Sequence, residues 1–399
     1  MQEPHHRFRT TSGGSGGVKV TGGVNPFTFA AVARVALTTA KASWTVRAIA
    51  GALASTLAGT LAGALVGTVT PVAWAAGPGT ATAAAALAGA APVSQNQTGG
   101  IDLHFRPDGT FTIVQFSDPQ DNESVNPRTL ALMEQVLDTE RPDLVVLTGD
   151  NISGSECKDA ALALRKIVAP MEQRHIPYAV VFGNHDDEGR LARAQLMKVL
   201  QEGAYNLSQS GPTNLPGVGN YYLLVHRHDG SEPVVALYFL DSGAYAPKAV
   251  GGYDWIKPAQ IDWYRETATS FKAQLGHVLP ALMFFHIPLP EFDTVWQNGT
   301  AIGSKNEDVC APKFNSGLFA AMVEVGDVKG VFVGHDHVND YIGELNGIRL
   351  AYGGSVGYDT YGKQGFPRRA RVIRLREDNP ANFETWIHLP PDHGLDPSW

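Results

Sequence analysis

Cysteine is scarce in this sequence: among 399 residues there are only Cys157 and Cys310. Neither stands in a CxxC or similar zinc-finger spacing, so a structural zinc site is not expected. Two cysteines permit one disulfide, and an exported protein would allow it to form. The sequence leaves open whether the two cysteines pair.

Charged residues are absent between Arg47 and Asp102. Within this interval, residues 48–75 are apolar and rich in small side chains, follow a basic segment and end in an A-x-A pattern. This layout is typical of a secretory signal peptide behind a long leading extension. A membrane anchor is the second interpretation, because the run before Pro71 is just long enough to span a bilayer. No Arg-Arg pair precedes the run, so a twin-arginine signal is not indicated.

The composition therefore divides the chain into three parts. Residues 1–75 are expected to be a leading extension with a signal peptide or anchor, residues 76–104 a flexible linker, and residues 105–399 a single catalytic domain. The expected location is extracellular, either secreted or anchored with the catalytic domain outside.

Basic residues are too few for a protein that binds the phosphate backbone of a nucleic acid. The chain has 31 Lys and Arg against 39 Asp and Glu. Six of the basic residues and one acid precede residue 76, so the remainder carries 25 basic and 38 acidic residues. Such a surface disfavours nucleic acid. It permits a small phosphorylated substrate, because bound metal ions can supply local positive charge.

From residue 105 onward, short apolar runs alternate with helical patterns, which indicates an α/β domain with a mixed double sheet. Strands are predicted at 111–116, 143–148, 178–182, 221–227, 233–241, 281–285, 331–333, 341–352 (a hairpin around Asn346-Gly347), 370–376 and 384–389. Helices are predicted at 127–140, 158–174, 190–202, 257–273 and 317–325.

Residues that can bind metal follow five of these apolar runs. They are Asp118, Asp150, Asn184, His286 and, in the stretch GHDH, His335 with His337. Ligands of open α/β sheets bind outside the carboxyl ends of the strands, so these side chains are expected at one rim. Each motif alone has an ordinary explanation as a turn, a helix cap or a core histidine. The ordered set D…GD…GNHD…H…GHDH is hard to explain in that way.

This ordered set resembles the calcineurin-like metallophosphoesterase superfamily, over roughly residues 110–355. The stretches HIPLPEF (286–292) and YGKQGFPRRARV (361–372) look like a branch related to purple acid phosphatases. The resemblance implies two mixed β-sheets packed as a sandwich and flanked by helices. It also implies two metal ions, Fe, Mn or Zn, bridged by Asp150. One ion would be held by Asp118, Asp150 and His337, and the other by Asp150, Asn184, His286 and His335.

The same resemblance implies the catalytic roles. A metal-bound hydroxide would attack phosphorus, and His185 would protonate the leaving oxygen as a general acid. Asp186 would orient the ring of His185.

The first motif departs from the family pattern. Many relatives have Asp-x-His there, whereas this chain has Gln120 in place of the histidine, and Ser153 stands where purple acid phosphatases have a tyrosine. The purple colour is therefore not expected. Gln120 is expected to complete the first metal site through its amide oxygen, with Asp121 or Asn122 as alternatives, and such a site favours Mn, Fe(III) or Mg over Zn.

Substrate-binding residues are sought in the loops. Residues 291–314 read as a long polar connection between two metal-bearing strands, and long loops are often functional. Asn315 and Ser316 would bind phosphate at a helix start, or else cap that helix. A pocket for the rest of the substrate would be lined by Tyr358, Tyr361, Lys363, Arg368 and Arg369, or else these residues belong to an ordinary turn with solvated charges.

The sequence thus predicts a secreted phosphomonoesterase with two metal ions. A phosphodiesterase or nuclease on the same scaffold is the alternative, because the fold does not determine the substrate. A third hypothesis is a homologue that binds a ligand without turnover, since the first motif is altered.

Overall fold

The computed structural model describes residues 100–391. The predicted signal peptide or anchor, and the linker up to residue 99, lie outside the described residues. Among residues 100–391, no helix is both long and apolar enough to cross a bilayer.

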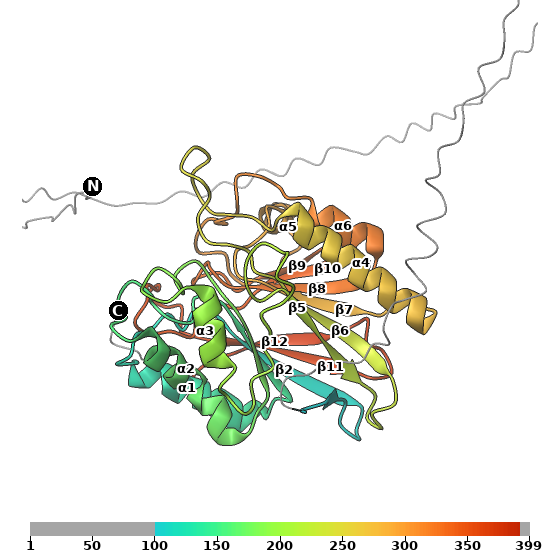
Figure 1. Cartoon of the computed structure of the whole chain (residues 1–399), viewed down its shortest axis with the longest axis horizontal. Helices are drawn as coiled ribbons and strands as arrows, with labels where there is room; N and C mark the ends of the chain where they lie inside the picture. Colours follow the sequence, from blue (N-terminus) through green and yellow to red (C-terminus); the bar gives the residue numbers. More distant parts are fainter. Residues whose placement is uncertain (1–99, 392–399) are drawn as a thin grey trace, which may run out of the picture. The chain divides into compact units, whose positions relative to one another are not determined.

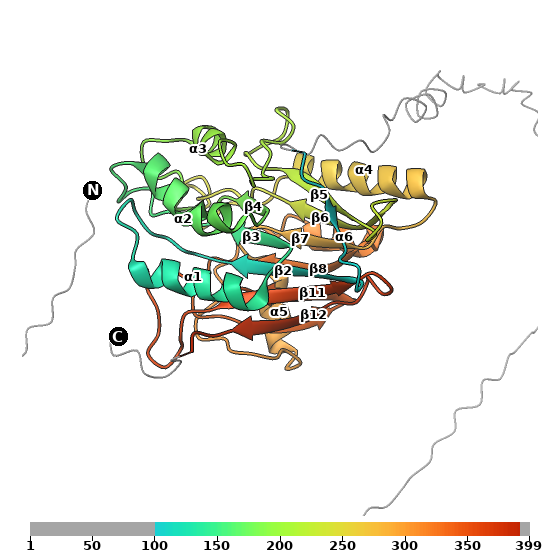
Figure 2. The ribbon, with the colours of Figure 1, turned by 90° about the horizontal axis from the view of Figure 1, so that it is seen from below.

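The described residues form two β-sheets with helices on their outer faces (Figures 1 and 2). The strands are β1 (Leu103–His104), β2 (Thr110–Phe116), β3 (Leu144–Thr148), β4 (Tyr178–Val181), β5 (Tyr221–His226), β6 (Pro233–Phe239), β7 (Ala281–Phe284), β8 (Val328–Val333), β9 (Ile342–Leu345), β10 (Ile348–Tyr352), β11 (Ala370–Arg376) and β12 (Glu384–His388). The helices are α1 (Pro127–Glu140), α2 (Ala160–Arg174), α3 (Arg193–Leu200), α4 (Pro258–Leu275), α5 (Glu291–Gln297) and α6 (Leu318–Val325).

One sheet has seven strands in the order β1-β5-β6-β7-β8-β10-β9, and the other has five in the order β12-β11-β2-β3-β4. Strands β2, β3 and β4 run parallel, as do β6, β7 and β8, which matches the short apolar runs between helices. The mixed double sheet predicted from the sequence is therefore confirmed.

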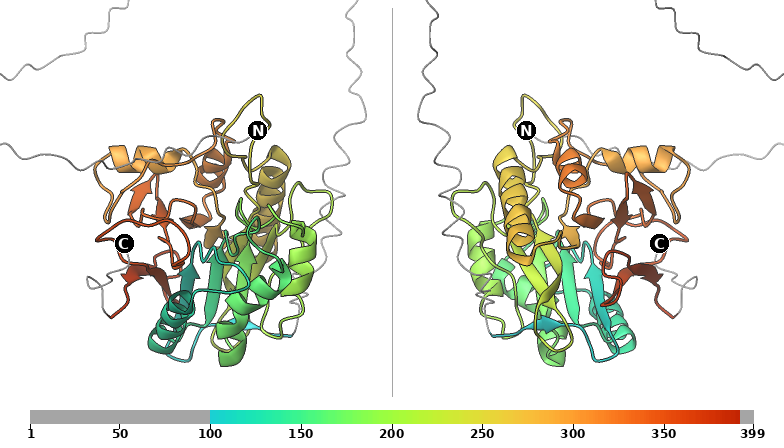
Figure 3. Two further views of the ribbon diagram at one scale, coloured as in Figure 1. Left: turned by 90° about the vertical axis from the view of Figure 1, so that its left-hand side faces the viewer. Right: turned by 90° about the vertical axis from the view of Figure 1, so that its right-hand side faces the viewer.

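Three apolar clusters hold these layers together. One contains residues of both sheets, such as Ile113 and Val146 from one and Leu237 and Phe284 from the other, so it fills the space between them. A second packs α1, α2 and α3 on the five-stranded sheet, and a third packs α4, α5 and α6 on the seven-stranded sheet. Figure 3 shows the two helical groups on opposite sides of the molecule. The strands are thus anchored on both faces, which fixes the positions of the loops at their ends.

Local sequence signals account for several element boundaries. Helix α1 begins as predicted with Pro127, and the Asn126 side chain accepts a hydrogen bond from the backbone of Arg128. The β9–β10 hairpin turns at Asn346 and Gly347, which both have positive φ.

Two parts of the sequence-based assignment differ from the structure. Residues 291–297 form helix α5 rather than the start of an irregular loop, because Phe292 and Val295 are buried in the apolar cluster on the seven-stranded sheet. Strand β1, with Leu103 buried, pairs with β5, so the folded part includes residues assigned to the linker.

The sequence left open whether the two cysteines form a disulfide. Cys157 and Cys310 are free thiols in the structure, so they do not.

Candidate metal centre

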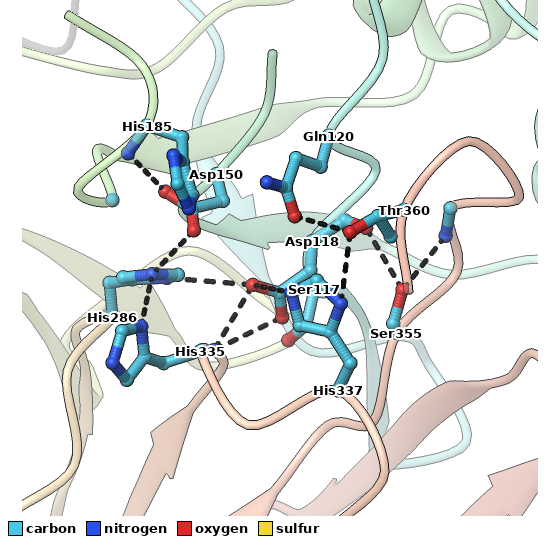
Figure 4. A network of polar contacts seen from close by, with 12 residues as sticks. Ser117, Asp118, Gln120, Asp150, His185, His286, His335, His337, Ser355 and Thr360 are labelled. Atoms are coloured by element: carbon cyan, nitrogen blue, oxygen red, sulfur yellow. Dashed lines mark hydrogen bonds and ion pairs between the residues drawn. The ribbon is translucent and has the colours of Figure 1, made fainter. Parts of the chain in front are cut away.

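The five predicted strand ends meet at one site (Figure 4). Asp118, Asp150 and Asn184 follow the parallel strands β2, β3 and β4 of one sheet. His286 and His335 follow the parallel neighbours β7 and β8 of the other. The site therefore lies where the carboxyl ends of strands from both sheets come together.

One group of ligand atoms surrounds Nε2 of His286. This nitrogen lies 3.1 Å from Asp150 Oδ2, 3.2 Å from Asn184 Oδ1 and 3.2 Å from His335 Nδ1. Asp150, His286 and His335 form a cluster whose ligand atoms all lie within 4.8 Å of one another. This is the set that the resemblance assigns to one of the two ions.

A second cluster shares Asp150 with the first. Asp118, Asp150 and His337 also offer ligand atoms within 4.8 Å of one another, and His337 Nε2 lies 3.4 Å from Asp118 Oδ1. Asp150 is the only residue common to both clusters, which is the arrangement that a bridging carboxylate requires.

Hydrogen bonds set the orientation of two of the histidine rings. His286 Nδ1 lies 2.9 Å from the Thr148 carbonyl oxygen, so it carries the proton and leaves Nε2 free as a ligand. His337 Nδ1 lies 3.1 Å from Thr360 Oγ1, and its Nε2 faces Asp118. Both rings therefore turn Nε2 toward the clusters, where a bound cation would take the place of a proton.

The backbone around the clusters is strained in the way expected of a functional site. Asp118, Gln120, Asp150 and His335 all have positive φ, an unusual conformation for residues with a side chain. Gly183 has no room for a side chain, because a Cβ there would collide with the Asp150 carboxylate. The strained backbone at these residues therefore allows the ligand atoms to approach one another closely.

Burial and mutual charge determine the electrostatics. Asp118, Asp150 and His286 are almost fully buried. Burial disfavours the imidazolium form of His286, but Asp150 and Asp118 outweigh it and raise the pKa of His286 to about 9. Burial likewise opposes ionisation of Asp150, yet His286 and the neighbouring histidines hold its pKa below the ordinary value. Two buried carboxylates facing three imidazoles and one amide fit a pair of cations with oxygen and nitrogen ligands.

The assignment of Asp186 to the His185 ring is wrong. The Asp186 carboxylate accepts hydrogen bonds from the backbone N–H groups of Gly183, Asn151 and Ile152. The partner of the ring is instead Glu188, whose Oε2 lies 2.7 Å from His185 Nδ1. Asp186 points into the loop that carries Asp150, so it braces the backbone there and cannot turn toward the imidazole.

Gln120 lies beside the second cluster. Its Oε1 accepts a hydrogen bond of 2.7 Å from Thr360 Oγ1, the same hydroxyl that contacts His337. An amide oxygen has two lone pairs, so metal ligation by Gln120 stays a prediction. Asp121 and Asn122, the two alternatives to Gln120 as a metal ligand, have other partners. Asp121 accepts a hydrogen bond from the backbone N–H of Asn126, and Asn122 accepts one from the backbone N–H of Ser124.

The predicted substrate residues have local partners. Asn315 accepts from the backbone of Gly317 and donates to Glu291, and Ser316 accepts from the backbone of Leu318. These are the contacts of residues at a helix start. The Tyr358 ring lies under the Arg128 guanidinium at 4.5 Å. Substrate binding by Asn315, Ser316 and Tyr358 stays a prediction.

Three aromatic residues surround the clusters, of which the sequence indicated Tyr361 but not Tyr245 or Tyr253. The Tyr361 ring stacks on His337 with centroids 4.0 Å apart, and the Tyr253 ring meets His335 edge-on at 4.2 Å. The Tyr245 hydroxyl contacts both Asn184 and Glu188. All three come from irregular loops, where no periodic pattern indicates which side chain turns inward.

Comparison with known proteins decides the family. The profile described as calcineurin-like phosphoesterase matches residues 111–339, more than half of the chain. The chain belongs to this family. The resemblance seen in the motifs is thus confirmed: the family implies a dimetal centre, and this metallophosphoesterase has two clusters of residues that could hold it.

Several of its curated relatives carry phosphatase names. The metallophosphoesterase is 40% identical over 317 residues to "Probable inactive purple acid phosphatase 29" of Arabidopsis thaliana, covering 73% of this chain and 81% of the relative. It is 38% identical over 330 residues to "Phosphatase DCR2" of Saccharomyces cerevisiae, covering 73% of this chain and 56% of that one.

Among solved structures, a dimetal phosphatase from Danio rerio aligns with a TM-score of 0.46 and 14% identity, covering 70% of this chain and 98% of that chain. A purple acid phosphatase from yellow lupin aligns with a TM-score of 0.39 and 13% identity, covering 70% of this chain and 53% of that chain.

Proposed function

We propose that this metallophosphoesterase is an active phosphomonoesterase that works after export. The observation that carries the proposal is the sharing of Asp150 by two clusters of buried ligands, each within 4.8 Å. Asp118 and His337 would hold one ion, and Asn184, His286 and His335 the other. Bound there, two cations would polarise the phosphoryl group and acidify a water molecule.

The remaining chemistry falls to side chains of this chain. The His185 side chain is 34% exposed, so it can reach a substrate at the mouth of the site. Its backbone N–H donates to Asp150 Oδ1 at 2.7 Å, which ties the ring's position to the bridging carboxylate. His185 would donate its proton to the leaving oxygen. Glu188 would hold the ring in orientation through Nδ1 and stabilise its protonated form for that step.

The surroundings of the site suit a small substrate. Beside the site lies a cleft of about 260 Å³, which Tyr245 and Lys257 line together with other residues, but not His185 or any residue of the metal clusters. This is close to the lower end of the range for small-molecule sites. Glu188 contacts His185, and Glu307 accepts a hydrogen bond from the Tyr361 hydroxyl beside His337, so carboxylates that would repel a polyanionic nucleic acid lie near the site. Parallel assays with an aryl phosphate monoester and the bis-aryl diester test the proposal, and faster turnover of the diester would contradict it.

The names of two relatives disagree about catalytic activity, because one is called a probable inactive purple acid phosphatase and the other a phosphatase. Activity is proposed here because the bridging carboxylate, the five other ligands and His185 are all present and gathered. Activity of the purified protein after metal reconstitution tests this point, and no turnover with any metal would support a binding role instead.

For the proposed export, the support is the apolar stretch at residues 48–75 behind a basic segment. N-terminal mass spectrometry of the protein from the extracellular fraction would locate the cleavage site. Protein found only in the membrane fraction, with this stretch intact, would favour the anchor.

Replacing Gln120 with histidine is expected to tighten zinc binding about tenfold. The reason is that a neutral imidazole is a better zinc ligand than an amide oxygen. Elemental analysis after dialysis measures the effect. The wild type is expected to retain fewer than two zinc ions per chain and to bind Mn or Fe in preference to zinc. Gln201→His, on an exposed residue, is the control for adventitious zinc. Two tightly held zinc ions in the wild type would contradict the prediction.

Replacing Glu188 with glutamine is expected to move the alkaline limb of the pH–rate profile to lower pH by about one unit. Burial lowers the pKa of His185, but Asp150 and then Glu188 outweigh it and raise the pKa above its ordinary value. The protonated form is the acid, so losing the Glu188 charge brings deprotonation at a lower pH. Glu202→Gln, in an exposed pair with Arg165, should leave the profile unchanged.

A further inference from the structure

Cys310 lies beside the metal centre but takes no part in it. Its sulfur, one ring nitrogen of His335 and one carboxylate oxygen of Asp336 lie within 4.8 Å of one another. Cys310 also donates its backbone N–H to Asp336 Oδ2 at 3.2 Å. The three residues thus form a cluster of their own, which we call the Cys310 cluster.

Two atoms of the Cys310 cluster are buried without a hydrogen-bond partner among residues 100–391. They are His335 Nε2 and Asp336 Oδ1, on side chains that are 7% and 1% exposed. The other ring nitrogen of His335 faces His286, so Nε2 is the atom left for a further partner (Figure 4). Unsatisfied polar atoms at such depth cost free energy, and an ion or ligand between them would remove that cost.

The ligand types point to a soft divalent cation. Zinc binds cysteine sulfur, imidazole nitrogen and carboxylate oxygen, and cadmium shares the preference for sulfur. The main centre offers only oxygen and nitrogen.

We propose that Cys310, His335 and Asp336 form an additional site for a soft divalent cation, Zn²⁺ or Cd²⁺, and that its occupation inhibits the enzyme. Binding replaces the proton of the Cys310 thiol and that of His335 Nε2 by bonds to the cation, and both protons go to solvent. A cation bound there would lie close to the main centre, and the repulsion between the two positive charges would hold the ion at His335 Nδ1 less tightly. The inhibition, but not the binding, rests on the proposed function.

Cadmium titration of the purified full-length protein with its resident metals tests the binding. A thiolate bound to cadmium gives an ultraviolet charge-transfer band that oxygen and nitrogen ligands do not give. The wild type and Cys157→Ser are expected to show the band with one equivalent, and Cys310→Ser to lack it. Asp336→Asn should raise the cadmium dissociation constant about tenfold.

The two cysteines make the outcome decisive. In Cys157→Ser the only thiol is Cys310, so absence of the band there would overturn the site. A band that persists in Cys310→Ser and disappears in Cys157→Ser would assign cadmium to the other thiol and also overturn it. Resident metal content, measured before titration, shows whether each variant is folded.

Turnover of an aryl phosphate tests the inhibition. Cadmium at saturation is expected to reduce turnover about tenfold in wild type and Cys157→Ser, and not in Cys310→Ser, each relative to its own cadmium-free rate. Equal inhibition of Cys310→Ser would place the effect at the main centre and overturn the regulatory part. A protein without any turnover would refute the proposed function, while the charge-transfer band would still decide whether the site exists.

Discussion

Asp150→Asn is expected to reduce phosphoester turnover at least about a thousandfold and to release both metal ions. Asp150 is the one side chain common to the two ligand clusters, with Oδ2 3.1 Å from His286 Nε2 and Oδ1 accepting from the His185 backbone. Asparagine keeps the shape of the side chain but removes its charge and replaces one oxygen by a nitrogen that cannot bind a cation.

Elemental analysis and steady-state kinetics with an aryl phosphate monoester measure the two effects together. Asp143→Asn is the matched control, because Asp143 directly precedes the same strand at its opposite end and pairs with Arg106. Asp143→Asn should keep both ions. An Asp150→Asn enzyme that retained two ions and most of its activity would show that Asp150 does not bridge the centre.

The ligand positions could be predicted because each depends on a strand. The runs ending at Phe116, Thr148 and Phe284 are mostly apolar and have no polar face, which predicts buried parallel strands with their carboxyl ends at one edge. Whatever follows such a strand enters the site. The signal was therefore present in local sequence, although the residues themselves are far apart along the chain.

The partner of His185 could not be predicted in the same way. Asp186 and Glu188 both follow the histidine closely, and the choice between them depends on how the loop turns. Burial and three backbone N–H donors hold Asp186 inward, and the Tyr245 hydroxyl holds Glu188 toward the ring. These contacts are tertiary, so no spacing rule gives them. Helix α5 was missed for a related reason: seven residues are too few to show a helical period.

His185→Ala is expected to lower turnover about 10²- to 10⁴-fold while both metal ions and the fold remain. The ring lies outside the ligand clusters, with Nδ1 2.7 Å from Glu188, so its removal takes away a proton donor without removing a ligand. The loss should be greatest for alkyl phosphates and smallest for nitrophenyl phosphate, because a good leaving group departs without protonation.

The dependence on the leaving group is what separates acid catalysis from a structural role. A distorted metal centre would slow all substrates by a similar factor, whereas a missing acid steepens the dependence of log kcat on the leaving group's pKa. His277→Ala is the matched control, because that exposed ring has the Leu275 carbonyl as its hydrogen-bond partner and its loss should change neither rate nor slope. If His185→Ala slowed every ester equally, the proton would come from elsewhere and His185 would serve only to position the substrate.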